Sequence, residues 1–282
     1  MNVLFLTMSS ALRDINISGI YTDLMRKFRN EGHTVYIIAP NERHTKRKTE
    51  LSIKNGVFFL GVQTLNLTKT NVIEKGIGQL LMEYQFKSAL KKHWGNIKFD
   101  IILYSTPPIT FTKVIKYVKN NNPKAITYLM LKDIFPQNAV DLGMLATTGC
   151  KGLLHKAFRR KERLLYRLSN YIGCMSPANV RYLINHNPEI NPKNVEIAPN
   201  SYDIPKSNNI NQERKGIRNK YSLPEDKPIF IYGGNMGKPQ GIPFLIECLS
   251  AVSNREDCHF VVVGDGTEYP KIKEWLDKAK PK

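Results

Sequence analysis

The apolar runs VLFLTM at residues 3–8 and TVYIIA at residues 34–39 decide the fold of this chain. Both runs are continuously apolar, which is typical of strands that are buried on both faces of a parallel sheet. Between them lie polar residues, Gly19 and a helical repeat of apolar residues that ends near Gly32. This order of strand, loop and helix predicts a βαβ unit.

The same alternation of strands and helices continues along the chain. Further strands are predicted at residues 57–62, 101–104, 126–130, 171–175 and 195–198, with helical segments between several of them. Residues 177–186 are predicted to form a helix. The recurring pattern indicates an α/β fold with a parallel sheet that is covered on both faces.

A polar segment at residues 203–211 (DIPKSNNIN) separates two such regions. Strands at residues 229–232 and 259–263 open the second region. The sequence therefore predicts two Rossmann-like domains with parallel sheets, residues 1–205 and residues 206–282. Because a sheet of two strands is small, we expect the second domain to be incomplete, with one face or edge uncovered.

Charge is the most informative bulk property. The chain has 42 Lys and Arg against 24 Asp and Glu, a net charge of +18, and residues 1–205 hold 29 of the basic and 14 of the acidic residues. A basic surface of this size attracts nucleic acid, anionic lipid headgroups or phosphorylated substrates. Nucleic acid is not an expected partner, because no recognisable binding motif accompanies the charge.

Several classes of protein are excluded by composition and spacing. A hydrophobic content of 41% supports a folded core. The four Cys lie far apart without a C-x-x-C pair, so a disulfide scaffold or zinc ribbon is not expected. The six His lack metal-ligand spacing and no D-x-D or G-x-S-x-G occurs, so neither a metal site nor a serine hydrolase is expected. No apolar run is long enough to span a membrane and no basic segment precedes the first residues, so we expect a cytoplasmic protein.

The strongest local feature is the segment YGGNMGKPQGIP at residues 232–243, between a predicted strand and a predicted helix. Glycines let backbone N–H groups approach a ligand, and a helix N-terminus attracts anions, so this segment suits a phosphate, with Lys238 as an added charge. A connecting turn without a ligand is an equally good interpretation. The segment VVVGDG at residues 261–266 repeats the arrangement, but Tyr269 stands where a dinucleotide fingerprint needs its third glycine.

Asp133, in the segment KDIFP, directly follows the predicted strand at residues 126–130. Ligands of open α/β sheets bind at the carboxyl edge of the strands, where this carboxylate would act as a general base. The alternatives are a helix cap or an ion pair with Lys132 or Arg160. The loop STPP at residues 105–108 follows another strand at the same edge and suits a binding wall or a plain helix start.

Residues 151–169 (KGLLHKAFRRKERLLYRLS) carry seven basic residues and one acidic residue on a predicted amphipathic helix. We expect its apolar stripe to lie in the core and its basic face to point toward phosphate or lipid. The basic loop RHTKRK at residues 43–48 suits a second such surface or a solvated run. The apolar stripe consists of Leu153, Leu154, Ala157, Phe158, Leu164, Leu165 and Leu168.

Taken together, these features resemble the GT-B glycosyltransferases of family 4, in particular the bacterial enzymes that build capsule or O-antigen. Each motif is short, but their order and spacing extend over nearly the whole chain. The matching segments are residues 3–8 with Gly19, 32–35 (GHTV), 132–136 (KDIFP), 174–176 (CMS), 197–203 (IAPNSYD), 234–241 (GNMGKPQG) and 263–266 (VGDG).

The resemblance implies transfer of a sugar from a nucleotide-diphosphate donor, with retention of configuration and without a bound metal or cofactor. The first domain would bind a lipid-linked or saccharide acceptor at the anionic inner-membrane surface, and the second domain would bind the nucleotide sugar. The implied catalytic residue is Asp133. The implied acceptor-binding residues are Gly19, Thr106 and Pro107, and the implied donor-binding residues are Gly234, Asn235, Lys238, Gly264 and Gly266.

Two departures from the family pattern stand out. Asn235 and Gln240 occupy positions where the family has Arg and Lys, which leaves Lys238 as the cation of this segment. The chain is also shorter than typical family members and lacks their later E-x7-E segment. An alternative is therefore a truncated, inactive relative that binds a membrane or a lipid-linked glycan.

Overall fold

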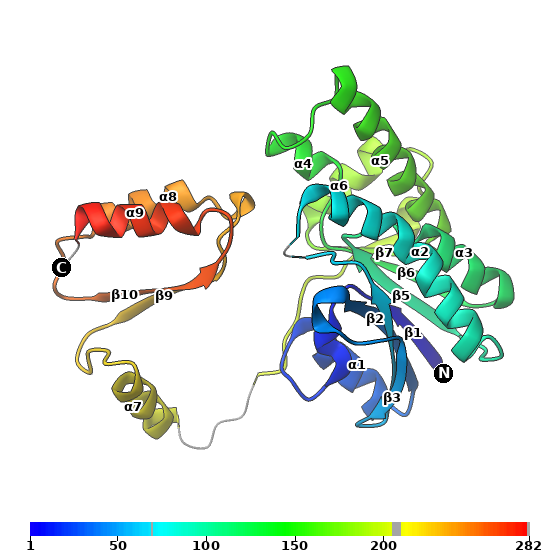
Figure 1. The fold of residues 1–282 in the computed structure, drawn as a ribbon, viewed down its shortest axis with the longest axis horizontal. Coiled ribbons are helices and arrows are strands. Elements are labelled where there is room, and N and C mark those ends of the chain that lie inside the picture. The colour runs from blue at the N-terminus through cyan, green and yellow to red at the C-terminus, as the bar shows by residue number, and fades with distance from the viewer. Residues whose placement is uncertain (69, 205–209, 281–282) are drawn as a thin grey trace. The chain divides into compact units, whose positions relative to one another are not determined.

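A computed structural model describes residues 1–68, 70–204 and 210–280 (Figure 1). The chain divides into two compact units, Met1–Ile204 and Pro205–Lys282, hereafter unit 1 and unit 2. The expected linker at residues 203–211 lies partly outside the described residues, and helix α7 already begins at Ile210.

Unit 1 is built around one eight-stranded sheet, with strand order β3-β4-β2-β1-β5-β6-β7-β8. All neighbouring strands are parallel except β3, which is antiparallel to β4. The strands are β1 Asn2–Leu6, β2 Thr34–Glu42, β3 Glu50–Lys54, β4 Val57–Thr64, β5 Ile101–Thr106, β6 Ile126–Leu131, β7 Tyr171–Cys174 and β8 Val195–Ile197. The helices are α1 Ile20–Asn30, α2 Val72–Trp94, α3 Thr112–Asn121, α4 Gln137–Asp141, α5 Gly149–Leu168 and α6 Pro177–His186, with short 3-10 helices at Ser10–Arg13, Arg43–Thr45 and Pro192–Asn194.

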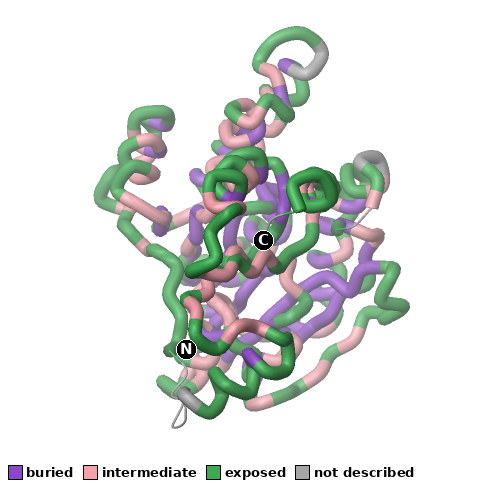
Figure 2. The backbone as a smooth tube through the Cα atoms, turned by 90° about the vertical axis from the view of Figure 1, so that its left-hand side faces the viewer, coloured by how far each residue is buried: buried purple, intermediate pink, exposed green. Residues whose placement is uncertain are grey.

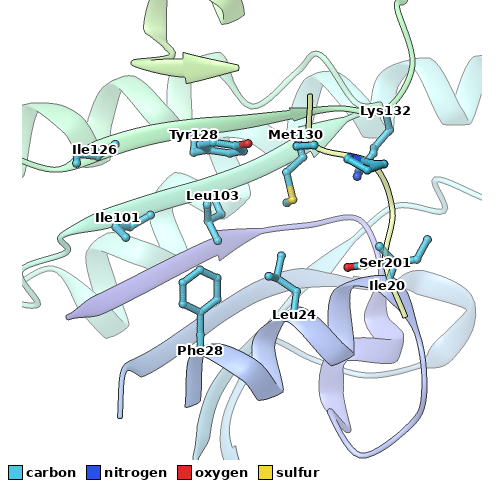
Figure 3. Close-up of a pocket in the computed structure, with 12 residues that line it drawn as sticks. Ile20, Leu24, Phe28, Ile101, Leu103, Ile126, Tyr128, Met130, Lys132 and Ser201 are labelled. Atoms are coloured by element: carbon cyan, nitrogen blue, oxygen red, sulfur yellow. The ribbon is translucent and has the colours of Figure 1, made fainter. Parts of the chain in front are cut away.

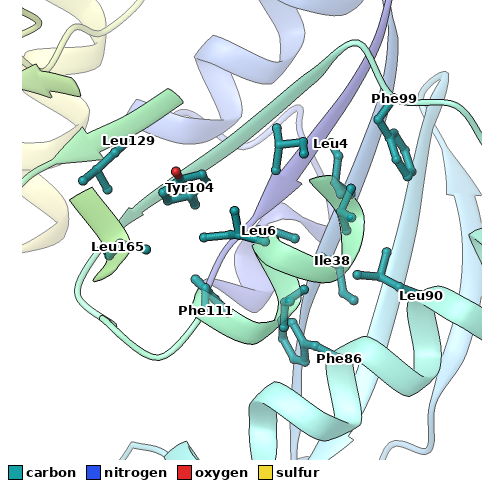
Figure 4. Close-up of a cluster of buried hydrophobic side chains, with 14 of the residues drawn as sticks. Leu4, Leu6, Ile38, Phe86, Leu90, Phe99, Tyr104, Phe111, Leu129 and Leu165 are labelled. Atoms are coloured by element: carbon teal, nitrogen blue, oxygen red, sulfur yellow. The ribbon is translucent and has the colours of Figure 1, made fainter. Parts of the chain in front are cut away.

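The core of unit 1 lies on both faces of this sheet, which explains why the strand runs are continuously apolar. Leu4 and Leu6 of β1 belong to the larger cluster, together with side chains of α2, α3 and α5 (Figure 4). Val3 and Phe5 alternate to the opposite face and pack with Met25 of α1. Buried positions accordingly concentrate on the strands, and exposed positions on the outer turns (Figure 2).

The antiparallel strand β3 corrects the expectation of a wholly parallel sheet. It forms a hairpin with β4 through Asn55 and Gly56, whose φ angles are 53° and 74°. An Asn-Gly pair with positive φ at both positions is the preferred connection for a tight hairpin. The basic loop before it is partly neutralised, since Arg43 pairs with Glu74 at 2.8 Å.

Unit 2 contains two parallel strands and a small core. That core consists of Met236, Ile242 of α8 and Ile272 of α9. Ile231 and Val263 are 70% and 59% exposed, so one face of the sheet is uncovered in the part of unit 2 that the structure describes, as expected from the sequence. The elements are α7 Ile210–Lys220, β9 Ile229–Asn235, the 3-10 helix Lys238–Gln240, α8 Ile242–Ala251, β10 His259–Asp265 and α9 Tyr269–Ala279.

Candidate functional site

The carboxyl edge of the unit 1 sheet brings Thr106, Pro107 and Asp133 together. Thr106, the last residue of β5, pairs with Leu131, the last residue of β6. Its hydroxyl donates a hydrogen bond of 3.0 Å to the backbone carbonyl oxygen of Asp133. The Thr106 side chain is therefore used to position the Asp133 segment, while Pro107 beside it is exposed.

The Asp133 carboxylate lies at this edge and is exposed. Among the described residues it forms no ion pair with Lys132 or Arg160, and the N-cap residue of α4 is Pro136. Burial raises the pKa of Asp133 above its usual range, although the residue stays accessible at the surface. A desolvated carboxylate with a raised pKa is a stronger base, as proton abstraction from an acceptor hydroxyl requires.

Tyr21 and Ser105 also belong to this site. Ser105 lies in the STPP loop that the sequence placed at this edge, whereas the sequence led to no prediction for Tyr21. Burial raises the pKa of the Tyr21 phenol, and the nearby Asp133 charge raises it further, whereas a hydrogen bond with the Ser105 side chain opposes both. The Tyr21 ring lies 5.2 Å from that of Phe5, which fixes it against β1. Its place at the start of α1, directly after the loop that contains Gly19, was the available signal.

An apolar cavity of about 330 Å³ lies between α1 and the sheet, beside the Asp133 segment (Figure 3). Figure 3 shows Leu24 and Phe28 of α1 opposite Leu103 and Met130 of the sheet. Lys132 lies at one end of the cavity, where burial lowers the pKa of its ammonium group. The cavity suits the apolar part of a ligand whose polar part lies near Asp133.

Gly19 takes part in the structure of unit 1 rather than presenting its amide to the surface. Its N–H donates to Asp23 Oδ1 at 3.1 Å, and Asp23 Oδ2 accepts from the backbone N–H of Asp203 at 2.9 Å. Arg26 binds the same Asp23 carboxylate. These contacts lower the pKa of Asp23, the Asp203 amide most of all. The cluster joins the start of α1 to the end of unit 1.

In unit 2, the glycines at the carboxyl ends of β9 and β10 have different roles. Gly234 pairs with Gly264, so both lie in strands rather than in the turn that was expected. A Cβ on Gly264 would lie 2.0 Å from the Gly234 carbonyl oxygen, and a Cβ on Gly266 would lie 2.5 Å from that of Met236. Close backbone packing therefore requires Gly264 and Gly266, whereas a Cβ on Gly234 would meet nothing within 4 Å.

The segment that follows β9 leads directly into α8. Gly241 adopts a left-handed conformation with φ 63°, and Pro243 stands in the first turn of the helix. Asn235 and Lys238 are exposed, whereas Gln240 Oε1 accepts a hydrogen bond of 3.2 Å from the Gly237 N–H. Exposed strand ends, a helix N-terminus and one ammonium group are features that suit a phosphate group.

Metal-ligand clusters and membrane-spanning helices are both absent from the described residues. No group of three or more His, Cys, Asp or Glu side chains in residues 1–68, 70–204 and 210–280 converges as metal ligands would. Within those ranges, no helix has the length and hydrophobicity needed to cross a bilayer.

Comparison with protein families and curated proteins gives limited information. No family model matches the chain. An alpha-D-kanosaminyltransferase of Streptomyces kanamyceticus is 33% identical over 64 residues, which is 22% of this chain. The match spans 16% of the length of that protein.

Comparison with solved structures identifies the fold. An alpha,alpha-trehalose-phosphate synthase (UDP-forming) from Burkholderia xenovorans in complex with glucose-6-phosphate has a TM-score of 0.65 at 8% identity, covering 99% of this chain and 70% of its own. A trehalose-6-phosphate structure from E. coli bound with UDP-2-fluoro glucose has a TM-score of 0.64 at 8% identity, with 99% and 69% covered. The UDP-GlcNAc 2-epimerase of Neisseria meningitidis bound to UDP-GlcNAc has a TM-score of 0.55 at 11% identity, with 99% and 69% covered. The chain thus has the α/β fold of the GT-B glycosyltransferases.

Proposed function

We propose that this protein transfers a sugar from a nucleotide-diphosphate donor to an acceptor hydroxyl. The observation that carries the proposal is the Asp133 carboxylate, which has a raised pKa and no ion pair with the described residues. Thr106 holds the backbone of Asp133 at the carboxyl edge of the sheet. We assign binding of the acceptor to unit 1 and binding of the nucleotide-sugar donor to unit 2. The fold supports the assignment of a glycosyltransferase, and two structural neighbours contain UDP-sugar ligands.

In the proposed reaction, Asp133 accepts the proton of the acceptor hydroxyl while the hydroxyl oxygen bonds to the anomeric carbon. The bond between that carbon and the diphosphate oxygen breaks, and the nucleoside diphosphate leaves with the electron pair. The new bond forms on the face of the carbon that the diphosphate leaves, as retention of configuration requires. Charge develops on the departing diphosphate, so donors preorganised at its position lower the barrier. The exposed end of β9 at Gly234, with Asn235 and Lys238, is the proposed diphosphate site, and Gly264 and Gly266 shape it from the neighbouring strand.

The finer assignment follows the motif pattern of the family 4 enzymes. We propose a retaining, metal-independent transfer to a lipid-linked or saccharide acceptor in surface polysaccharide biosynthesis, at the inner face of the membrane. The apolar cavity beside Lys132 supports an acceptor with an apolar portion. The short match to a kanosaminyltransferase supports transfer of a sugar but not a particular acceptor.

The test is transfer of radiolabelled sugar from a panel of nucleotide sugars into a lipid extract and into soluble saccharides. The wild-type protein is expected to label one of these fractions. Asp133→Ala is expected to fold normally and to lose at least about 100-fold in rate, the usual contribution of a general base. Equal rates with unchanged melting temperatures would remove Asp133 from the mechanism.

A second candidate function is binding of a lipid-linked glycan without transfer. It is favoured by Gln240, which stands where the family has Lys and whose side chain is hydrogen-bonded within its own loop. This candidate predicts acceptor binding by the purified protein but no release of nucleoside diphosphate from any donor. Release of diphosphate above the uncatalysed rate would exclude it.

A further inference from the structure

The outer surfaces of α2 and α5 carry exposed apolar side chains, which we call the outer patch. Leu80 of α2 is 58% exposed and Leu153 of α5 is 70% exposed. Exposed apolar patches on folded proteins mark contact sites for other molecules or for membranes. The outer patch consists of Ile77, Leu80, Leu81 and Tyr84 of α2 and Leu153, Leu154 and Leu164 of α5.

The structure corrects the expectation that the whole apolar stripe of α5 lies in the core. Leu165 is buried and Phe158 is partly buried, so these side chains do pack inward. Leu153, Leu154 and Leu164 are exposed instead. The helix therefore has a second apolar surface, which the sequence pattern alone did not separate from the first.

The two helices of the outer patch are linked to each other. Lys161 of α5 forms an ion pair of 3.2 Å with Glu83 of α2. Lys113 of α3 donates to the Tyr84 hydroxyl and lies 4.1 Å above its ring. Figure 1 shows α2, α3 and α5 along one side of the sheet. Apolar side chains of α2 and α5 thus belong to one helical layer.

A cationic surface borders the outer patch on α5. Six basic side chains, His155, Lys156, Arg159, Arg160, Arg163 and Arg167, surround a shallow cavity of about 350 Å³. Arg159 and Arg163 are neutralised by Glu162 and Glu189. Lys156 and Arg160 are exposed and form no ion pair with the described residues. Apolar side chains therefore lie beside uncompensated positive charge.

We propose that the outer patch docks on the surface of an anionic lipid bilayer. Its apolar side chains enter the boundary between headgroups and acyl chains, and Lys156 and Arg160 contact lipid phosphates. A second copy of the chain is a poorer occupant, because residues 1–205 carry 29 basic against 14 acidic residues and two such surfaces repel each other.

Docking through α5 would bring the candidate site at Asp133 close to the membrane surface. The Phe158 ring on the inner side of α5 packs edge-on against Phe135 at 5.1 Å, two residues after Asp133. Because α5 lies between the carboxyl end of β6 and the amino end of β7, its first turns lie near the edge that carries Asp133. A docked α5 therefore holds Asp133 close to membrane-borne hydroxyl groups. Only this consequence rests on the proposed sugar transfer.

The experiment is co-sedimentation of the protein with phosphatidylcholine vesicles, with and without phosphatidylglycerol. Wild type is expected to bind the anionic vesicles more strongly. Two double variants test the surface: Leu80→Glu with Leu153→Glu, and Lys156→Glu with Arg160→Glu. Each is expected to lower the partition coefficient at least about tenfold, because the first removes apolar contacts with the bilayer and the second removes attraction to lipid phosphates.

Matched controls place the same substitutions on other exposed positions of unit 1. Leu51→Glu with Ile53→Glu on β3, and Lys98→Glu with Lys124→Glu just before β5 and β6, are expected to reduce binding less than the outer patch variants. Equal losses for patch and control variants would overturn the proposal, as would no binding by wild type at low salt. If the wild-type protein were a dimer without lipid and the outer patch variants were monomers, the surface would be assigned to a second copy. Because the assay needs no nucleotide sugar, vesicle binding and sugar transfer can fail independently.

Discussion

The Thr106 hydroxyl donates a hydrogen bond of 3.0 Å to the carbonyl oxygen of Asp133, which joins the ends of neighbouring strands β5 and β6. Thr106 is 2% exposed, so water has little access to replace this bond. We expect Thr106→Val to lower kcat about tenfold, because the Asp133 segment loses its anchor, and to cost roughly 1 kcal/mol of stability. Steady-state kinetics and urea unfolding measure the two effects.

Thr106→Ser is the matched control for this substitution. It keeps the hydroxyl and is expected to retain most of the turnover. If the Val and Ser variants were equally active, the hydrogen bond would have no part in positioning Asp133.

The pH dependence of turnover is a second prediction. A base works only when it is deprotonated, so the rate should fall as pH decreases through the raised pKa of Asp133. The acidic limb is therefore expected above 3.8, the ordinary value for this carboxyl group. A profile of kcat/KM between acidic and neutral pH measures it, and a limb at or below 3.8 would contradict the desolvated environment of Asp133.

The same shift predicts how stability responds to replacing Asp133. A raised folded-state pKa contributes stability below the unfolded value, and that contribution is lost as pH rises through the folded value. At neutral pH the partly desolvated charge of Asp133 is a cost. Asp133→Asn should consequently unfold at an equal or higher urea concentration than wild type at pH 7, and a lower midpoint would argue that the carboxylate has a stabilising partner.

Two glycines of unit 2 form a matched pair for a fourth prediction. Gly264→Ala places a Cβ 2.0 Å from the Gly234 carbonyl oxygen and should destabilise unit 2 by more than about 2 kcal/mol. Gly234→Ala meets no atom within 4 Å and should leave stability nearly unchanged while weakening nucleotide-sugar binding. Thermal unfolding and calorimetric titration separate the two effects. Equal destabilisation by both substitutions would contradict the packing described here.

Asp23 gives a fifth prediction. Its pKa is lowered, chiefly by the hydrogen bond from the Asp203 amide, so it contributes stability above its unfolded value of 3.8 that is lost as pH falls through the folded value. Asp23→Asn should reduce the urea midpoint at pH 7, and the difference from wild type should shrink below pH 3.8. A difference that is constant with pH would show that the charge of Asp23 has no part.

The sequence predicted the parallel strands of unit 1, though not their order in the sheet, because continuous apolar runs report burial on both faces. It placed α6 at the residues where the structure has it, since Ser176 and Pro177 mark a helix start. It missed β3, although Asn55 and Gly56 gave a hairpin signal, because the preceding basic run was interpreted as a loop. Thr106 and Asp133 were placed correctly at the carboxyl edge of the sheet, because each ends or closely follows a strand that the local sequence predicts.

Other features of the site depend on tertiary contacts and left no local pattern. Tyr21 is positioned by the packing of α1 against β1, and the Gly19 N–H donates a hydrogen bond to the Asp23 carboxylate. Likewise, the exposure of Leu153 depends on where α5 begins relative to the sheet. Periodicity shows that such a helix has an apolar stripe, but neighbouring helices decide which part of it is covered.

The most direct test of the account is the initial rate of acceptor-dependent release of nucleoside diphosphate, with wild type and Asp133→Asn measured side by side. The account predicts that the wild-type protein releases diphosphate only when donor and acceptor are both present, and at least about 100-fold faster than the variant. Rates that are equal for the two proteins, or independent of the acceptor, would contradict it.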